Sequence, residues 1–435
     1  MDQRSGRRKT KNYAMPSFPS MATANGRNIG QMADAIDRVS CAIVGAGQAG
    51  ARAAIAMRNA GFETSIGLFG DEDLLPYERP QLSKEFLLAD ATEPALIKKR
   101  QEWRDLDIAV SLSIAVRRVE ADTRQLVLAN GKTIGFDQVL IATGTKPRRL
   151  AALETTDIPV HYLRTAADSL ALRRSLRKDA RIAIVGGGVI GLEVAAAAAQ
   201  RGAMVTVVEA ASSLLARALP CPIAELVEAR HRAAGVAFVY GTTVTGTQQG
   251  AVCLSNGNTL AADAVVVGIG VEPEVEAVCG LGIADADGIR VDPQGRTALP
   301  FAFAAGDVAV QYSPWHGRWM RIETWANANA QAEVAARVIA GGEASHNQAP
   351  WFWSDQHDLN LQVVGDALGS ETVLRGDPEP HKAVMVALRE GRVVGGVTLN
   401  APREMAGLRR LVRSRPHLAP EVLADPTTDL RKLVA

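Results

Sequence analysis

The chain has 435 residues, of which 47% are hydrophobic and 22% charged, with 48 Lys and Arg against 47 Asp and Glu. The length predicts two to four domains and favours three, and the hydrophobic fraction excludes a compositionally disordered chain. A formal net charge of +1 gives no general electrostatic reason to expect nucleic acid or an anionic membrane as the main partner. The Ala-rich stretch after Val194 is bounded by Glu193 and Gln200, so no membrane-spanning helix is expected and a soluble protein is predicted.

Residues 1–38 differ from the rest of the chain. They carry more basic than acidic side chains, lack the apolar segment of a secretory signal and show no helical or strand periodicity. We expect a mobile, basic extension, with the folded chain beginning near Val39. A translation start at Met15, Met21 or Met32 and a functional basic arm are the two interpretations that the residues leave open.

One glycine motif occurs twice. Residues 43–50 read IVGAGQAG and residues 184–191 read IVGGGVIG, so that each contains GxGxxG. Each motif follows a short β-branched run, opens an Ala-rich helix (51–60 and 192–201) and precedes a second strand (64–69 and 204–208). The motif glycines are Gly45, Gly47, Gly50, Gly186, Gly188 and Gly191.

The three glycines have separate roles in a dinucleotide-binding turn. The first allows the tight turn, the second lets the backbone approach a pyrophosphate, and the third lets helix and strand pack closely. An acid after the second strand can bind an adenosine ribose, and Asp71 and Glu209 occupy these places. The sequence therefore predicts two bound dinucleotides. Glu209 would repel a 2′-phosphate, and Arg217 is the only nearby basic residue that could receive one. The second site is therefore predicted to prefer NADH over NADPH.

Further strands end in turns that suit such ligands. Segments 140–144 and 265–271 are apolar and lead into Gly-containing turns, and segment 303–308 ends in Gly-Asp. Asp307 could bind a ribityl hydroxyl there, with the following helix directing its positive end at the ligand.

The spacing of the cysteines and histidines gives no indication of a metal site. The four cysteines, Cys41, Cys221, Cys253 and Cys279, are far apart, and the seven histidines form no HxH or HExxH cluster. We therefore expect no metal site built by the protein, and free thiols in a reducing cytoplasm.

Taken with these motifs, three segments make the chain resemble the FAD-dependent pyridine-nucleotide oxidoreductases. They are YERPQLSK at 77–84, RIETWAN at 321–327 and PWFWSDQ at 350–356. They are most similar to NADH-dependent ferredoxin reductases that serve Rieske-type ring-hydroxylating dioxygenases and some haem monooxygenases. The resemblance runs from about Val39 to Arg415 and departs at Gln81, where the family usually has a second proline.

The resemblance implies FAD in the first site and NADH in the second. For FAD it implies these contacts: the pyrophosphate and ribose by Ala49 and Asp71, the central part by Arg79 and Lys84, the adenosine side by Val116 and Arg148, the ribityl chain by Asp307 and the ring border by Trp325. For NADH it implies Ile190 at the nicotinamide half, Glu209 and Arg217 at the adenosine half, and Glu193 near the nicotinamide.

Lys84 and Glu193 are the candidate catalytic residues. Glu193 could pair with Lys84 beside the flavin, and the Lys84 cation would stabilise the reduced flavin after hydride transfer. Other interpretations stay open: Lys84 as a solvated helix residue, Glu193 in a structural salt bridge and Trp325 as a core aromatic.

The cysteine pattern bears on how electrons leave the flavin, because thiol-dependent relatives place a reactive cysteine in the helix that follows the first βαβ unit. Residues 76–90 contain no cysteine, and Cys41 begins a strand, where packing is its natural role. A thiol relay is therefore disfavoured, and the resembling subfamily passes single electrons to an acidic [2Fe–2S] ferredoxin. A basic run could dock it, although a solvated helix face is the alternative: Arg403, Arg409, Arg410, Arg413 and Arg415.

Two other functions remain open for this chain. One is an NADH oxidase or a quinone or small-radical reductase of the same architecture. The other is a flavoprotein that signals NADH binding to a partner.

The expected fold class is α/β, with two doubly wound Rossmann-like domains, as in glutathione reductase, and a C-terminal α+β domain. We expect a discontinuous FAD domain at 39–148 and 273–345, an NADH domain at 149–272, and the C-terminal domain at 346–435. Strands at 383–387 and 392–397 and a helix near Met405 belong to the last of these.

Overall fold

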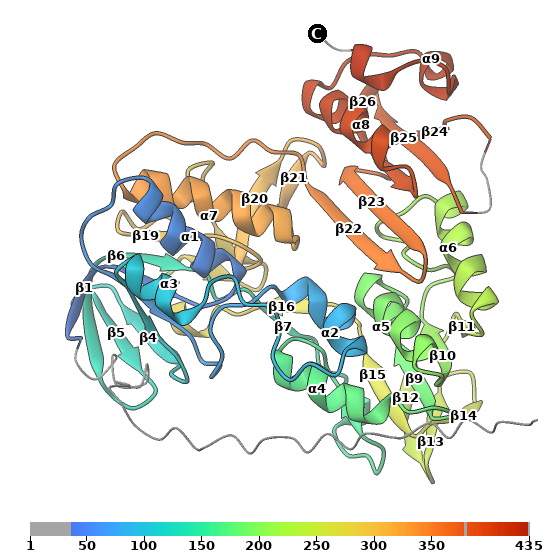
Figure 1. Cartoon of the computed structure of the whole chain (residues 1–435), viewed down its shortest axis with the longest axis horizontal. Helices are drawn as coiled ribbons and strands as arrows, with labels where there is room; N and C mark the ends of the chain where they lie inside the picture. Colours follow the sequence, from blue (N-terminus) through green and yellow to red (C-terminus); the bar gives the residue numbers. More distant parts are fainter. Residues whose placement is uncertain (1–35, 378–380, 434–435) are drawn as a thin grey trace, which may run out of the picture.

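The computed structural model describes residues 36–377 and 381–433. Nearly all of the predicted basic extension, residues 1–35, therefore lies outside the described residues. The described chain forms three units, each built on its own sheet. Figure 1 shows the first from blue to teal with a gold and orange part, the second from green to yellow, and the third in orange and red.

The first unit contains a seven-stranded sheet of order β3-β2-β1-β6-β5-β4, with β19 pairing β6. Strands β1, β2, β3, β6 and β19 are parallel, whereas β4 and β5 extend the sheet as an antiparallel meander. Its strands are β1 (Arg38–Val44), β2 (Ile66–Phe69), β3 (Ile108–Ser111), β4 (Val116–Glu120), β5 (Gln125–Leu128), β6 (Thr133–Ile141) and β19 (Ala302–Ala304).

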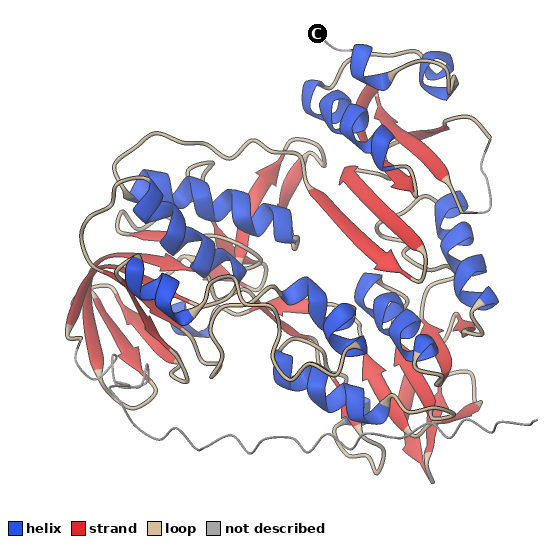
Figure 2. Cartoon of the chain, viewed as in Figure 1, coloured by secondary structure: helices blue, strands red, loops and turns tan. Residues whose placement is uncertain are grey.

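Helices α1 (Gln48–Asn59) and α7 (Trp325–Ile339) lie side by side on one face of this sheet (Figure 2). Alanines such as Ala54 and Ala332 are fully buried between them, and their small side chains let the two helices approach closely. The short helix α3 (Arg100–Asp105) adds the buried Trp103 to the same core.

The second unit is a five-stranded parallel sheet of order β11-β10-β9-β15-β8. Its strands are β8 (Val160–His161), β9 (Arg181–Val185), β10 (Met204–Glu209), β11 (Ala237–Tyr240) and β15 (Ala264–Val267). Helices α4 (Ala166–Ser175), α5 (Val189–Gln200) and α6 (Cys221–Ala233) accompany it, with a small antiparallel sheet of β12 (Val244–Gln248), β13 (Ala251–Leu254) and β14 (Thr259–Ala261).

A segment of the first unit packs on the second. The 3-10 helix η3 (Arg79–Ser83) and helix α2 (Glu85–Leu88) follow β2, yet Leu87 is buried in the core of α4, α5 and β9. Phe86 and Leu82 likewise contact Ala166 of α4. This packing brings Lys84, between η3 and α2, beside α5.

The third unit is an antiparallel sheet of order β22-β23-β26-β25-β24. One face carries α8 (Pro402–Ser414) with α9 (Pro420–Ala424) and the 3-10 helix η6 (Leu430–Lys432), and the other face packs on α5 and α6. Its strands are β22 (Trp351–Gln356), β23 (Leu359–Gly365), β24 (Glu371–Leu374), β25 (Ala383–Arg389) and β26 (Arg392–Leu399).

Small elements complete the chain. A two-stranded sheet of β7 (Thr145–Pro147) and β16 (Val271–Pro273) connects the first two units, and a four-stranded sheet precedes α7. That sheet contains β17 (Ala284–Asp285), β18 (Gly288–Arg290), β20 (Ala309–Ser313) and β21 (Arg318–Arg321). The remaining 3-10 helices are η4 (Ala151–Leu153) and η5 (Glu276–Val278).

The predicted fold class is confirmed, with differences at the ends of several elements. Helices α1 and α5 begin at Gln48 and Val189, three residues before the expected starts, and β2 begins at Ile66 rather than at residue 64. The strand expected at 265–271 ends at Val267, because Gly270 has a φ of +101° and β16 begins only at Val271. The strand expected at 303–308 ends at Ala304, and Gly306 turns the chain with a φ of +82°. Strand β1 begins at Arg38, inside the predicted extension. The domain boundaries themselves stay predictions.

Across residues 36–377 and 381–433, none of the helices combines the length and the apolar character that a membrane span needs. The same residues contain no group of three His, Cys, Asp or Glu side chains placed to hold a metal ion.

Candidate functional site

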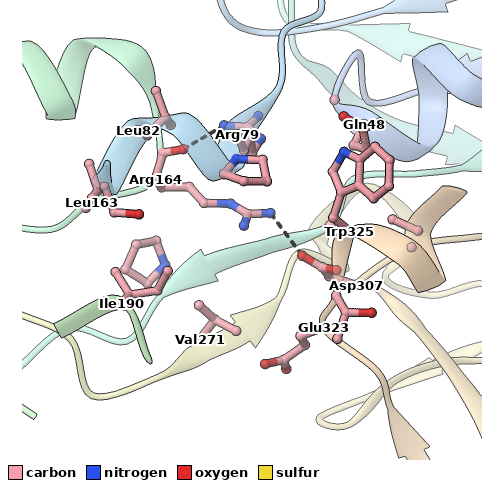
Figure 3. A pocket seen from close by; sticks show the side chains of 18 of the residues that line it. Gln48, Arg79, Leu82, Leu163, Arg164, Ile190, Val271, Asp307, Glu323 and Trp325 are labelled. Carbon is pink, nitrogen blue, oxygen red and sulfur yellow. Dashed lines mark hydrogen bonds and ion pairs between the residues drawn. The ribbon is translucent and has the colours of Figure 1, made fainter. Parts of the chain in front are cut away.

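A cavity of about 570 Å³ lies where the three units meet, and both glycine turns open into it. Figure 3 shows part of its lining, with Arg164 and Ile190 of the second unit opposite Asp307 and Trp325 of the first. Thirteen of the predicted site residues line it: Gly45, Gly47, Ala49, Asp71, Arg79, Lys84, Gly188, Ile190, Gly191, Glu193, Arg217, Asp307 and Trp325.

Five predicted site residues do not line this cavity: Gly50, Val116, Arg148, Gly186 and Glu209. Gly50 and Gly186 belong to the turns, but they face neighbouring backbone rather than the cavity. Val116 begins β4, and Arg148 is an exposed residue that follows β7. Glu209 ends β10, and its carboxylate accepts hydrogen bonds from the backbone N–H groups of Gly187 at 2.6 Å and Ala211 at 2.7 Å.

The two turns have the same backbone form. Gly45 has a φ of +109°, and a Cβ there would lie 2.3 Å from the Ala142 carbonyl oxygen. Gly186 has a φ of +105°, and its Cβ would lie 2.4 Å from the Gly268 oxygen. Only glycine fits either position without moving the neighbouring strand.

Both turns suit a pyrophosphate. Gly47 and Gly188 are the N-cap residues of α1 and α5, and neither offers a side chain to bind the first N–H groups of its helix. A Cβ on Gly188 would meet nothing within 4 Å, so the backbone is open to a ligand. Free N–H groups and a positive helix end are the features that bind phosphate oxygens, so the residues present fit two dinucleotides.

A network of ionised side chains lies between the turns. Arg164 lies 3.5 Å from the Asp307 carboxylate, as the dashed line in Figure 3 marks. Arg79 forms an ion pair of 2.6 Å with Glu72 and donates to the Arg164 carbonyl at 2.7 Å. The Tyr77 hydroxyl donates to Glu72 as well, and burial raises the pKa of Tyr77. Asp307 and Arg79 are thus held by partners that the sequence reasoning did not name.

Lys84 and Glu193 form the pair that the resemblance implied. Their Nζ and Oε1 atoms lie 3.4 Å apart, and the two side chains are 10% and 3% exposed. The interpretation of Lys84 as a solvated helix residue is therefore wrong. Burial raises the pKa of Glu193, while Lys84 and hydrogen bonds from Ser354 and Ser83 act to lower it.

Aromatic rings form one wall of the cavity. The Trp325 indole meets Trp353 edge to face at 5.7 Å between centroids, and its Nε1 donates to Glu78. Lys84 Nζ lies 5.3 Å from the Trp353 ring centre, and Phe352 also lines the cavity. Trp325 is half-buried at the cavity edge rather than in a hydrophobic core.

No cysteine of the described residues lines the cavity. Cys41 is fully buried in β1, and burial raises the pKa of its thiol to about 12. A buried thiol with such a pKa is not a nucleophile at neutral pH, so the expected packing role of Cys41 is confirmed.

The predicted basic run lies on and beyond α8. Arg403, Arg409, Arg410 and Arg413 are exposed on the helix, and Arg409 covers the Trp351 ring at 5.0 Å. Arg415 differs, because it is the half-buried residue that ends the helix, with a φ of +51°. Four of the five arginines thus share an exposed surface.

The main residues that sequence reasoning missed are Glu72, Arg164 and Trp353. Glu72 directly follows the predicted acid Asp71, and Trp353 belongs to the quoted PWFWSDQ segment, so local signals existed for both. Arg164 follows β8 and offers no such signal, because its place beside Asp307 results from the contact between the first two units.

Comparisons with known proteins agree with this geometry. Residues 39–332 match the family described as pyridine nucleotide-disulphide oxidoreductase, and residues 351–434 match a family described as reductase C-terminal. The ferredoxin–NAD(+) reductase component of the p-cumate 2,3-dioxygenase system of Pseudomonas putida is 44% identical over 393 residues, covering 89% of this chain and 97% of the relative. The corresponding component of the anthranilate 1,2-dioxygenase system of Burkholderia cepacia is 39% identical over 396 residues, covering 89% and 98%.

Solved structures agree as well. Putidaredoxin reductase, in its covalent complex with putidaredoxin, superposes with a TM-score of 0.87 at 32% identity, covering 92% of this chain and 98% of that one. The ferredoxin reductase for the CYP199A2 system of Rhodopseudomonas palustris gives a TM-score of 0.85 at 34% identity, covering 92% and 100%. The chain therefore belongs to the pyridine nucleotide-disulphide oxidoreductase family.

Proposed function

We propose that this protein is an NADH-dependent ferredoxin reductase that contains FAD and supplies electrons to an oxygenase through a [2Fe–2S] ferredoxin. One observation carries the proposal. Two dinucleotide-binding turns open into a single cavity that contains the Lys84–Glu193 pair and no cysteine among its described lining residues. The named functions of the relatives support the same conclusion.

The first turn is the proposed FAD site. Gly45, Gly47 and Ala49 would receive the pyrophosphate at the N-terminus of α1, with Asp71 at the ribose and Asp307 at the ribityl chain. Lys84 would place its ammonium beside the ring system, and Trp325 would border it. When bound, FAD accepts a hydride from NADH and releases its two electrons one at a time.

The second turn is the proposed NADH site. Gly188 and Gly191 would admit the pyrophosphate to the N-terminus of α5, with Arg217 at the adenosine half. Ile190 is 48% exposed at the mouth of the cavity, which suits a ligand that enters and leaves. The roles of Glu209, Val116 and Arg148 stay predictions, because these side chains do not line the cavity.

The overall reaction balances without a thiol. One NADH gives two electrons and becomes NAD⁺, two oxidised ferredoxins each take one electron, and one proton is released. We propose that the ferredoxin docks on the exposed arginines of α8, because Arg409 contacts Trp351, which stacks on Trp353 of the cavity wall at 5.4 Å. Transient electron-transfer complexes are often guided by charge.

The test compares acceptors under anaerobic conditions. Purified holoprotein is first reduced with NADH in the absence of oxygen. Separate samples are then mixed with an oxidised [2Fe–2S] ferredoxin, with a quinone, or with oxygenated buffer. We expect fast reoxidation of the flavin band by ferredoxin alone. Faster reoxidation by oxygen or quinone would favour the oxidase or quinone reductase, and slow reoxidation by every acceptor would favour an NADH-responsive signalling flavoprotein.

Salt tests the docking surface separately. We expect ferredoxin reduction to slow as ionic strength rises, because screening weakens attraction between α8 and an acidic partner. The double variant Arg410→Gln, Arg413→Gln should lose most of this salt dependence, while Arg117→Gln with Arg118→Gln, exposed arginines on β4, should keep it. A rate that is insensitive to salt in all three proteins would exclude the α8 surface.

A cytoplasmic location is also proposed, on the ground that free cysteines suit a reducing compartment.

A further inference from the structure

Polar side chains, buried except for the half-buried His357, form a continuous series that leads from Glu193 away from the cavity. Ser354 Oγ lies 2.7 Å from Glu193 Oε1, and Gln356 Nε2 lies 2.9 Å from Ser354 Oγ. His231 Nε2 lies 2.9 Å from Gln356 Oε1, and His231 Nδ1 lies 3.2 Å from His357 Nε2. We call Ser354, Gln356, His231 and His357 the polar chain.

The polar chain joins three elements of two units. Glu193 belongs to α5, His231 to α6, and Ser354 and Gln356 to one face of β22, two residues apart. Ser354 and His231 are fully buried, and Gln356 is 2% exposed. Polar groups buried this deeply are costly unless hydrogen-bonded, and each of these three has a partner on both sides.

The direction of the hydrogen bonds depends on the charge of Glu193. An ionised carboxylate only accepts, so Ser354 must donate to it and Gln356 Nε2 must donate to Ser354. Gln356 Oε1 then accepts from His231 Nε2–H, and His231 Nδ1 accepts from His357 Nε2–H. Every donor therefore points toward Glu193, and His231 must be the Nε2–H tautomer.

A protonated Glu193 would favour the opposite direction. Its hydroxyl could donate to Ser354, which would donate to the oxygen of a turned Gln356 amide. The amide nitrogen would then donate to His231 Nε2, leaving the proton of His231 on Nδ1. The two charge states of Glu193 thus correspond to two tautomers of His231.

We propose that Ser354, Gln356 and His231 are positioning residues that keep Glu193 ionised and thereby hold the Lys84 ammonium at the cavity wall. The tautomer of His231 then reports the charge of Glu193. The part of this proposal that concerns flavin rests on the proposed function, whereas the tautomer assignment does not. Ser83 Oγ, which donates to Glu193 Oε2, completes the set of donors around the carboxylate.

The polar chain does not act as a proton path. A neutral amide holds its protons on nitrogen, so Gln356 cannot readily accept a proton on one side and release one on the other. Its two ends can only orient their neighbours. The polar chain is therefore a directional support for a charge, and its effect at the cavity is electrostatic.

The charged groups around the polar chain do not obscure the dependence of the His231 tautomer on the charge of Glu193. Lys84 faces Glu193, while Arg230 and Asp358 lie near the histidines. Burial lowers the pKa of His231 and lowers that of His357 to about 4, so both rings are neutral at pH 7. A change in the His231 tautomer near neutral pH would therefore follow Glu193.

Nitrogen NMR of the full-length holoprotein, labelled in its histidine rings, tests the assignment. The His231 signal is identified by its loss in His231→Gln. We expect the Nε2–H tautomer in the wild type and a change toward Nδ1–H in Lys84→Met, where the carboxylate loses its cation. The control Arg164→Met removes another cavity cation, one that pairs with Asp307, and should leave the tautomer unchanged.

A charged ring or an Nδ1–H tautomer in the wild type would overturn the proposal. So would an unchanged tautomer in Lys84→Met. Ser83→Ala gives a second comparison should that variant fail to fold, because it removes a donor to the carboxylate from outside the polar chain and should move the His231 tautomer in the same direction. An unchanged signal would count against the proposal.

The midpoint potential of the bound flavin tests the consequence at the cavity. We expect His231→Leu to make the potential more negative, because a weakly held Lys84 stabilises the reduced flavin less. His231→Gln keeps a donor for Gln356 and should restore the wild-type potential. Equal potentials in all three proteins would overturn the positioning role. A protein that binds no FAD would contradict the proposed function alone, and the tautomer measurement would still decide the assignment.

Discussion

The two glycine turns share a backbone but differ in what surrounds them. Gly45 and Gly186 have nearly the same φ, and the third glycines, Gly50 and Gly191, would each place a Cβ within 2.2 Å of the first glycine's oxygen. Around the first turn, Arg79 lies 3.7 Å from where a Cβ on Gly47 would stand. Around the second turn, the corresponding space beside Gly188 is open.

The difference shows how one motif can serve two kinds of ligand. The first turn is covered by η3, by the turn that contains Asp307 and by α7, so a ligand there would be enclosed on several sides. The second turn opens toward solvent beside Ile190. We infer that the enclosed turn suits a cofactor that stays bound and the open turn suits a nucleotide that is exchanged in every turnover.

The largest effects are expected from the first glycine of each turn. Gly45→Ala and Gly186→Ala each force a Cβ against a backbone oxygen at a positive φ, which should cost at least about 3 kcal/mol. Gly45→Ala should abolish the yellow colour, whereas Gly186→Ala should keep FAD and lose NADH binding. Visible absorbance measures the bound FAD, and titration with NADH measures NADH binding. Loss of both ligands in both variants would remove the distinction between the turns.

The Lys84–Glu193 pair lies where the two regions meet, and breaking it should have the next largest effect. Lys84→Met leaves Glu193 buried without a cation, which should destabilise the protein by about 3 kcal/mol at pH 8. Burial already raises the pKa of Glu193 above its unfolded value, so stability is retained at low pH and lost as pH rises through the folded pKa. Urea unfolding at pH 5, 6.5 and 8 should therefore show a loss that grows with pH.

The double variant Lys84→Met, Glu193→Gln provides the control for that measurement. It removes both charges, so its stability should return toward the wild type and lose this dependence on pH. A Lys84→Met variant that is equally stable at all three pH values would contradict the buried pair.

Replacing Asp307 should weaken ligand binding at the enclosed first turn only. Asp307→Ala removes a carboxylate at the cavity and leaves Arg164 without its partner, so FAD should bind roughly 10- to 100-fold more weakly. The dissociation constant for NADH should stay within about twofold, provided that the protein is saturated with FAD. Equal weakening of both ligands would show that Asp307 supports the cavity as a whole.

Replacing Glu209 should have the smallest effect, and it should change the preference between NADH and NADPH. The wild type should use NADH at least about tenfold better than NADPH in kcat/KM, because a 2′-phosphate would lie against a carboxylate. Glu209→Ser should narrow this ratio, and Asp71→Ser, the acid beside the other turn, should leave it unchanged. A wild type that uses NADPH as well as NADH would refute the assignment.

Much of the fold could be predicted from the sequence, because each turn is encoded within a single short segment. The positions of Gly45 and Gly186 directly after their strands follow from local pattern alone, and Asp307 lies in the turn that follows β19. Cys41 was likewise predicted to be a packing residue from its place in β1.

The partners of the site residues could not be predicted in the same way. Arg164 reaches Asp307, and His231 reaches Gln356, across contacts between separate units that no local spacing encodes. Lys84 meets Glu193 only because Leu87 packs among α4 and α5. The basic run on α8 was predicted as one surface, but Arg415 ends the helix in a left-handed conformation and is separated from the exposed four.

Anaerobic titration of the purified holoprotein with NADH shows whether the two turns bring a flavin and a nicotinamide together. We expect a yellow protein with one FAD per chain, whose visible band is bleached completely by one equivalent of NADH. A colourless protein that takes up no added FAD would contradict this expectation, as would a bound flavin that NADH leaves oxidised.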